Sequence, residues 1–229
     1  MYKNIKVIAL DADDTLWVNE PYFREVEHQF AQLLSPYETE NKINQELYKK
    51  EIDNLELYGY GIKGFVLSMV EAALEISNYK ISSKEIQQII SFGKDMLNKP
   101  IELLDGVEEV LKKLSPNYKL ILATKGDLLD QERKLKKSGL HKYFDHIEVL
   151  SDKQKDNYQY LIDFLEVNPS EFLMIGNSLK SDVLPLVELD SNAIHVPYHT
   201  TWIHEEVVHQ NNGDSYKTVQ SLSDVLAFL

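Results

Sequence analysis

Ile5-Lys6-Val7-Ile8-Ala9-Leu10-Asp11-Ala12-Asp13-Asp14-Thr15 is an apolar run that ends in three clustered carboxylates. The apolar part has the composition of a buried β-strand, so the carboxylates would stand at the edge of a sheet. Negative charge is costly there unless a cation or a reaction uses it. Asp11 and Asp13 are two residues apart, and on an extended strand end their side chains lean to the same side. The pattern therefore predicts a site where one carboxylate attacks and the other transfers protons.

From Gly106 onward, short apolar runs alternate with amphipathic ones, as expected for a parallel sheet with connecting helices. Further strands are expected at residues 119–123, 146–150, 172–175 and 193–196. Helices are expected near 106–115, 128–138, 157–166 and 180–189, with Asp105 and Asp127 as N-caps. Strands separated by helices make right-handed crossovers. Together with residues 5–10 they predict an α/β fold, a doubly wound parallel sheet covered on both faces.

Residues 18–98 interrupt this alternation and predict a helical insertion. Apolar residues recur at helical spacing most clearly between Ile62 and Leu74. Three further helices are expected from Phe23 to Leu33, over residues 43–57, and from a Ser82–Glu85 capping box onward. We therefore expect an α/β core domain of residues 1–17 and 99–229, and an all-helical domain of residues 18–98. Because ligands of open α/β sheets bind at the carboxyl ends of the strands, this insertion would cover the site.

The composition limits the partners of the chain and its compartment. The 229 residues carry a formal net charge of −13, so nucleic acid is a poor partner, because its phosphates need a basic patch. Cysteine is absent, which excludes disulfides and thiolate metal sites and fits a reducing compartment. The sequence has no apolar signal segment and no apolar stretch of membrane-spanning length. We therefore expect a cytoplasmic protein with no membrane partner, and the sequence does not indicate an oligomeric state.

Three other expected strand ends supply polar groups that can complete the site. Thr124-Lys125-Gly126-Asp127 follows one strand, Ser151-Asp152-Lys153 the next, and Gly176-Asn177-Ser178 the one after, with Asp182 a helical turn beyond. Hydroxyl, amide and lysine groups can hold an oxyanion. Carboxylates and the Asn177 oxygen can hold a hard cation such as Mg²⁺.

In this order, the four segments resemble the motifs of the haloacid dehalogenase superfamily of phosphohydrolases. The first motif of that family, Asp-x-Asp-x-Thr after a strand, matches Asp11, Asp13 and Thr15. The second, a Ser or Thr at a strand end, matches Thr124, and the lysine of the third matches Lys153 or, alternatively, Lys155. The fourth, Gly-Asp-Ser with a later Asp, matches Gly176-Asn177-Ser178 and Asp182, with Asn177 in place of the usual Asp. The helical insertion resembles the first cap type of the family, so the resemblance covers nearly the whole chain.

The resemblance implies a Mg²⁺-dependent phosphatase that acts on a small phosphorylated metabolite, a phosphate monoester. Asp11 would be the nucleophile and form an aspartyl-phosphate, and Asp13 would be the general acid and base. The phosphoryl group would be bound by Thr124, Lys125, Gly126 and Lys153. The metal ligands would be Asp11, Asp13 through its backbone carbonyl, Asn177 and Asp182. Because an amide oxygen brings no charge, Asn177 would leave this site with one negative charge fewer than is usual in the family.

Three alternatives stay open at this level. A phosphomutase of the same family shares the first two aspartates and differs in how the cap holds a phosphorylated sugar. A phospho-acceptor domain of the receiver type combines similar residues, but it is shorter and has no helical cap. A ligand-binding relative with weak catalysis is suggested by Asn177. A dehalogenase of the family, in contrast, lacks an acid/base Asp such as Asp13.

Some polar residues near these motifs receive no chemical role from the sequence. The charged run Glu132-Arg133-Lys134 is expected on a solvated helix face. Asp14 is interpreted as a turn residue, and Thr15 as a brace for the turn below Asp11.

Overall fold

The structure is a computed structural model of the chain, and it describes residues 2, 4–207 and 215–229. The residues form two compact units. The first comprises Met1–Glu20, Ile101–Lys125 and Gln131–Leu229, and the second Pro21–Pro100 and Gly126–Asp130. No helix in the described parts of the chain has the length and apolar character needed to cross a membrane.

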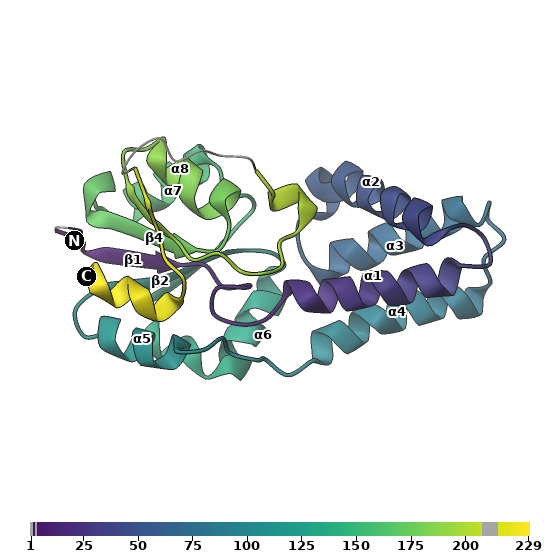
Figure 1. The fold of residues 1–229 in the computed structure, drawn as a ribbon, viewed down its shortest axis with the longest axis horizontal. Helices are drawn as coiled ribbons and strands as arrows, with labels where there is room; N and C mark the ends of the chain where they lie inside the picture. Colours follow the sequence, from purple (N-terminus) through teal and green to yellow (C-terminus); the bar gives the residue numbers. More distant parts are fainter. Residues whose placement is uncertain (1, 3, 208–214) are drawn as a thin grey trace. The chain divides into compact units, whose positions relative to one another are not determined.

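The first unit is built on a six-stranded parallel sheet in the order β3-β2-β1-β4-β5-β6 (Figure 1). The strands are β1 (Val7–Leu10), β2 (Lys119–Lys125), β3 (His146–Leu150), β4 (Phe172–Gly176), β5 (Asn192–His195) and β6 (Lys217–Thr218). The predicted doubly wound α/β fold is therefore confirmed. β6 has only two residues, too few to leave an apolar pattern in the sequence.

Helices cover both faces of this sheet, because alternate strand residues point to opposite sides. Ile8 and Leu10 of β1 share one core with α5 (Val107–Leu114) and α6 (Leu128–Ser138). Val7 and Ala9 share the other core with α7 (Lys155–Phe164) and α8 (Leu184–Val187). Figure 1 shows these two helix pairs on opposite sides of the sheet. The connections contain η1 (Leu140–Tyr143), η2 (Pro169–Glu171), η3 (Leu179–Val183) and η4 (Ile203–Glu205), and η5 (Leu222–Ala227) follows β6.

The order of the strands reverses between β1 and β4. The chain runs from β1 through β2 to β3 on one side and then returns to β4 on the other side of β1. Leu10 pairs with both Leu122 and Ile175, and the Asp11 amide donates to the Ile175 carbonyl at 2.9 Å. Ligands of open α/β sheets bind at such a reversal, outside the carboxyl ends of the strands. Asp11 thus stands where this fold favours a site.

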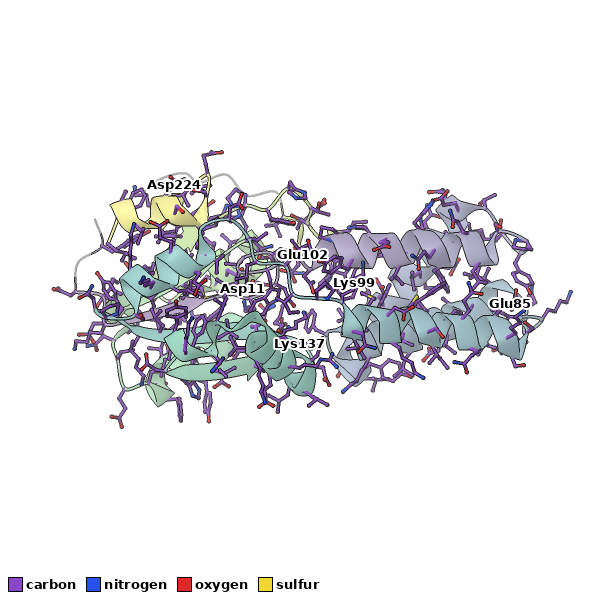
Figure 2. All side chains as sticks on the ribbon, turned by 90° about the horizontal axis from the view of Figure 1, so that it is seen from below. Asp11, Glu85, Lys99, Glu102, Lys137 and Asp224 are labelled. Carbon is purple, nitrogen blue, oxygen red and sulfur yellow. The ribbon has the colours of Figure 1, made fainter. Side chains whose placement is uncertain are left out.

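The second unit is helical and contains α1 from its second residue onward (Glu20–Leu34), α2 (Glu40–Tyr58), α3 (Ile62–Ile76) and α4 (Ser83–Asn98). Residues 18–98 are all described, and none of them lies in a strand. Their core includes Phe30, Ile43, Phe65 and Ile89. The predicted capping box opens α4, since the Ser82 amide donates to Glu85 Oε2 at 2.8 Å and the Glu85 amide to Ser82 Oγ at 3.3 Å. Figure 2 shows Glu85 and Lys99 at opposite ends of this helix.

Some local predictions for the helices need correction. Asp127 does cap α6, because the Asp130 amide donates to its Oδ1 at 3.1 Å. Asp105 does not cap α5, whose N-cap is Gly106 with φ at 76°, a left-handed conformation that suits glycine. The single helix expected near 180–189 is divided into η3 and the short α8, because Pro185 has no N–H to donate and fits only in a first helical turn.

Candidate active site

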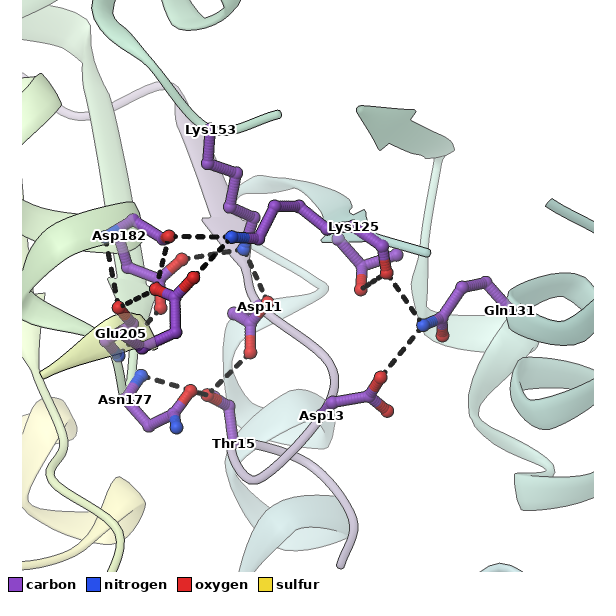
Figure 3. Close-up of polar contacts among 12 residues, drawn as sticks. Asp11, Asp13, Thr15, Lys125, Gln131, Lys153, Asn177, Asp182 and Glu205 are labelled. Atoms are coloured by element: carbon purple, nitrogen blue, oxygen red, sulfur yellow. Dashed lines mark hydrogen bonds and ion pairs between the residues drawn. The ribbon is translucent and has the colours of Figure 1, made fainter. Parts of the chain in front are cut away.

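Asp11 is buried at the end of β1, and both oxygens of its carboxylate accept hydrogen bonds (Figure 3). Lys153 Nζ donates to Asp11 Oδ1 at 2.5 Å. Thr15 Oγ1 lies 3.1 Å from Asp11 Oδ2, and it accepts a hydrogen bond from the backbone N–H of Asn177 at 3.1 Å. Thr15 therefore braces the turn below Asp11, as predicted, and also connects it to the end of β4.

Lys153 is 1% exposed and lies between two carboxylates, because its Nζ also donates to Asp182 Oδ1 at 2.6 Å. Burial lowers the pKa of Lys153, but Asp11 and Asp182 outweigh this effect and raise the pKa well above its ordinary value. Burial raises the pKa of Asp11 to about 7, with Lys153 opposing the rise and Asp182 adding to it. One ammonium thus faces two buried carboxyl groups. Lys155, the other match to the third motif, is exposed at the start of α7.

Asp182 is held on both sides by protein donors. Its Oδ1 accepts from Lys153, and its Oδ2 accepts from the Ser178 amide at 2.9 Å. Gly176 makes this placement possible, because a Cβ at that position would overlap the Asp182 carboxylate. These contacts give Asp182 a role in holding Lys153, and they do not support its predicted role as a metal ligand.

Asn177 directs its side-chain amide at several oxygen atoms of the acidic loop. The end of the amide that faces the loop lies 3.2 Å from the Asp13 carbonyl oxygen and 3.3 Å from Asp11 Oδ2. With its nitrogen at that end, the amide donates to both oxygens. With its oxygen there, that oxygen lies 3.2 Å and 3.3 Å from two others, close to the spacing of about 3 Å between neighbouring ligands around Mg²⁺.

This set of oxygens fits a hard cation, although it is poor in charge. Asp11 supplies one carboxylate, and the Asp13 carbonyl and Asn177 supply neutral oxygens. Within the described ranges, no group of three or more His, Cys, Asp and Glu side chains could hold a metal ion. A Mg²⁺ ion here would therefore depend on backbone and amide oxygens as well as on Asp11.

The Asp13 side chain points toward α6 (Figure 3). Its Oδ1 accepts from Trp17 Nε1 at 2.6 Å and from Lys134 Nζ at 2.8 Å, and its Oδ2 accepts from Gln131 Nε2 at 2.9 Å. The prediction that Lys134 lies on a solvated face is wrong, because its side chain is 12% exposed and pairs with Asp13. An amphipathic pattern shows that a face is polar, but it does not show what that face meets.

Lys125 ends β2 with its ammonium directed at Glu205 and Ser181. The Nζ atom lies 2.7 Å from Glu205 Oε1 and 2.9 Å from Ser181 Oγ. Glu205 Oε2 also accepts from the hydroxyls of Ser178 at 2.6 Å and Ser181 at 2.5 Å. Burial raises the pKa of Glu205, but Lys125 and the two hydroxyls outweigh it and lower the pKa to about 2. No local sequence pattern marks Glu205, because only the fold brings η4 to the end of β2.

The remaining phosphate-binding candidates are Thr124 and Gly126. Thr124 is buried at the end of β2, and its hydroxyl donates to the Lys125 carbonyl at 3.2 Å. Gly126 lies in the segment that groups with the second unit, so its place in the phosphate site stays a prediction.

Comparison with known proteins connects this arrangement to one family. The sequence model of haloacid dehalogenase-like hydrolases matches residues 5–190. A solved haloacid dehalogenase-like family hydrolase from Xanthomonas campestris is 35% identical, with a TM-score of 0.88 over 98% of this chain and 90% of that one. The HAD-hydrolase YfnB from Bacillus subtilis, solved bound to magnesium, shares the fold at 16% identity, with a TM-score of 0.67 over 99% of both chains.

A curated relative matches a shorter stretch. N-acylneuraminate-9-phosphatase from Mus musculus is 31% identical over 87 residues, which are 35% of this chain and 35% of the mouse protein. The match therefore spans about a third of the length of that relative.

Proposed function

Because the chain belongs to the haloacid dehalogenase-like hydrolase family, we propose that it is a Mg²⁺-dependent phosphatase that hydrolyses a small phosphate monoester through an aspartyl-phosphate on Asp11. The observation that carries this proposal is the buried Asp11 carboxylate, held between Lys153 Nζ and Thr15 Oγ1 at the strand reversal. The name of the mouse relative, a phosphatase, supports a phosphate ester as the substrate class.

In the first step, a carboxylate oxygen of Asp11 attacks phosphorus, and the bond from phosphorus to the ester oxygen breaks. Lys153 offsets the repulsion between Asp11 and the phosphoryl oxygens, because its ammonium already lies 2.5 Å from Asp11. We assign the binding of the phosphoryl oxygens to the Thr124 hydroxyl and to the backbone amides of Lys125 and Gly126. The Lys125 ammonium is directed at Glu205 instead.

Asp13 is the general acid and base in this proposal. It gives a proton to the departing alkoxide, so that an alcohol leaves. Its carboxylate then takes a proton from the water that attacks the aspartyl-phosphate. The second step releases inorganic phosphate and restores the Asp11 carboxylate.

The residues that would hold Mg²⁺ are Asp11, Asp13 through its carbonyl oxygen, and Asn177. The ion supplies positive charge for the negative charge on the phosphoryl oxygens. Asp182 is left out of this set, because both of its oxygens are bound by Lys153 and Ser178.

We assign residues 18–98 to a cap domain that contributes to the choice of substrate. The support is their position in the sequence, directly after the acidic loop, and their wholly helical structure. Chimaeras that exchange this segment with that of a relative would test the assignment. They should prefer a different ester and still require Asp11.

A panel of phosphate esters assayed with Mg²⁺ tests the proposed function. We expect the native chain to release inorganic phosphate from at least one small ester, and Asp11→Asn to lose that activity by about a thousandfold or more, because the nucleophile is gone. Asp105→Asn, which removes an exposed carboxylate that caps no helix, is the control and should keep the native rate. Hydrolysis that survives Asp11→Asn would exclude Asp11 as the nucleophile. Isomerisation of a phosphosugar without release of phosphate would favour a phosphomutase.

A further inference from the structure

Two side chains of α6 contact the Asp13 carboxylate, and neither belongs to the four motifs. Gln131 Nε2 lies 2.9 Å from Asp13 Oδ2, and Lys134 Nζ lies 2.8 Å from Asp13 Oδ1. They are three residues apart on one helix, so they project from the same face. Trp17 Nε1 completes the set of donors from the loop itself. The carboxylate is thus fixed in orientation by contacts on both of its oxygens.

Gln131 is placed in a way that packing does not explain. The residue is 2% exposed, and its Oε1 is buried without a hydrogen-bond partner among the residues that the structure describes. An unpaired buried oxygen lowers stability, so an apolar side chain of the same size would suit the packing better. What the glutamine provides is its nitrogen, which donates to Asp13 Oδ2 and to the Lys125 carbonyl, both at 2.9 Å. One amide thereby connects the acidic loop after β1 with the end of β2.

Lys134 makes the second connection. Its Nζ donates to Asp13 Oδ1 and also to Asn19 Oδ1 at 3.0 Å, so it bridges two positions on the segment that follows β1. Its side chain is 12% exposed, and solvent therefore screens this ion pair less than a surface pair.

We infer that Gln131 and Lys134 are positioning residues that hold the Asp13 carboxyl group in the orientation needed to protonate the leaving group. The inference rests on the proposed function, in which Asp13 is the general acid. A general acid acts only within hydrogen-bond reach of the atom it protonates, so a freely rotating Asp13 would spend less time in a productive geometry.

The nature of the leaving group separates this role from a structural one. An alkoxide needs a proton as it leaves, whereas p-nitrophenolate is a stable anion and leaves without one. The experiment measures kcat on an alkyl phosphate and on p-nitrophenyl phosphate for the native chain, Asp13→Asn, Gln131→Met and Lys134→Met. We expect the ratio of the alkyl to the aryl rate to fall about tenfold in Gln131→Met and in Lys134→Met. Asp13→Asn, which removes the general acid itself, should lower the same ratio further.

Three further variants or measurements distinguish a positioning role from a structural one. Gln131→Met removes the unpaired oxygen but also the two hydrogen bonds of the nitrogen, so its melting temperature is measured beside the rates and should stay close to that of the native chain. Lys134→Arg should recover part of the lost ratio, since it keeps a cation near Asp13. Lys137→Met, which changes an exposed lysine one turn further along α6 (Figure 2), should keep the native ratio.

A native ratio in both α6 variants would overturn the inference. So would a proportional fall of both rates together with a lower melting temperature, because that result indicates a structural role. If Asp11→Asn is inactive while the ratios stay native, only this inference fails. If Asp11→Asn remains active, the proposed function fails first.

Discussion

The side-chain amide of Asn177 lies against two oxygen atoms of the acidic loop after β1, and its orientation decides whether they need a cation. The end of its amide that faces the loop lies 3.3 Å from Asp11 Oδ2 and 3.2 Å from the Asp13 carbonyl oxygen. A nitrogen at that point donates hydrogen bonds to both oxygens without a cation. An oxygen there would be held beside them by a bound cation. A carboxylate in this place would face Asp11 at close range, and the repulsion would be relieved only by a bound cation.

We predict that Asn177→Asp is less stable than the native chain in the presence of a chelator and binds Mg²⁺ about tenfold more tightly or better, because the site gains a charged ligand. Melting temperature measured against Mg²⁺ concentration checks both parts, since a ligand that binds only the folded state raises stability as its concentration rises. The prediction is wrong if the two proteins respond equally to Mg²⁺ and melt at the same temperature without it.

Lys153→Met tests the other charge at this site. It leaves Asp11 and Asp182 buried without the ammonium that both contact. Removal of one partner from a buried ion pair costs about 3–5 kcal/mol, so we expect a loss of that order in the free energy of unfolding, measured in urea. The exposed Lys155→Met is the matched control and should change stability by less than about 0.5 kcal/mol. Equal stabilities of the two variants would show that Lys153 is not needed to balance these carboxylates.

At the scale of the elements, η4 is connected to the end of β2 and to the segment after β4 by one half-buried carboxylate. Glu205 accepts from Lys125 and from the hydroxyls of Ser178 and Ser181. These contacts lower its pKa from 4.5 to about 2. Because the folded-state pKa is the lower one, ionised Glu205 stabilises the fold fully above about pH 4.5, and this contribution is lost as the pH falls from there to about 2.

We therefore predict that Glu205→Gln lowers the free energy of unfolding by about 3 kcal/mol at pH 7, and that the difference from the native chain narrows as the pH falls below 4.5. Urea unfolding at a series of pH values measures this directly. Glu206→Gln, at the exposed neighbouring position, should show no such dependence. A difference between Glu205→Gln and the native chain that stays constant with pH would contradict the account of Glu205.

Local sequence patterns predict most of the strands, but they do not predict which side chains meet in the folded chain. β1, β2 and β4 contain continuous apolar runs bounded by polar residues, and such runs predict buried parallel strands. β3 and β5 have polar residues among their apolar ones, so their patterns are weaker. The sequence does not predict that Lys134 meets Asp13, because a helical pattern gives a face and not its neighbour. Glu205 is not predicted for a related reason, since its partners Lys125 on β2 and Ser181 on η3 are brought to it only by the folded chain.

At the scale of the whole molecule, the order of the motifs along the chain predicts most of the candidate site. Asp11, Thr124, Lys153 and Asn177 lie far apart in sequence, each after an expected strand. A parallel sheet collects the carboxyl ends of its strands at one edge, so the fold class alone predicts that these residues meet. The identity of the ester does not follow in the same way, because neither the motifs nor the sheet encodes it.

The measurement that tests the proposed chemistry most directly is rapid quench of the enzyme during turnover of an ester with a radiolabelled phosphoryl group. Peptide mapping of the quenched protein should place the label on Asp11, at up to one group per chain, and the label should disappear in a chase with unlabelled ester. Asp11→Asn should carry none. Steady release of phosphate with no labelled protein at any time, or label that persists in Asp11→Asn, would contradict covalent catalysis by Asp11.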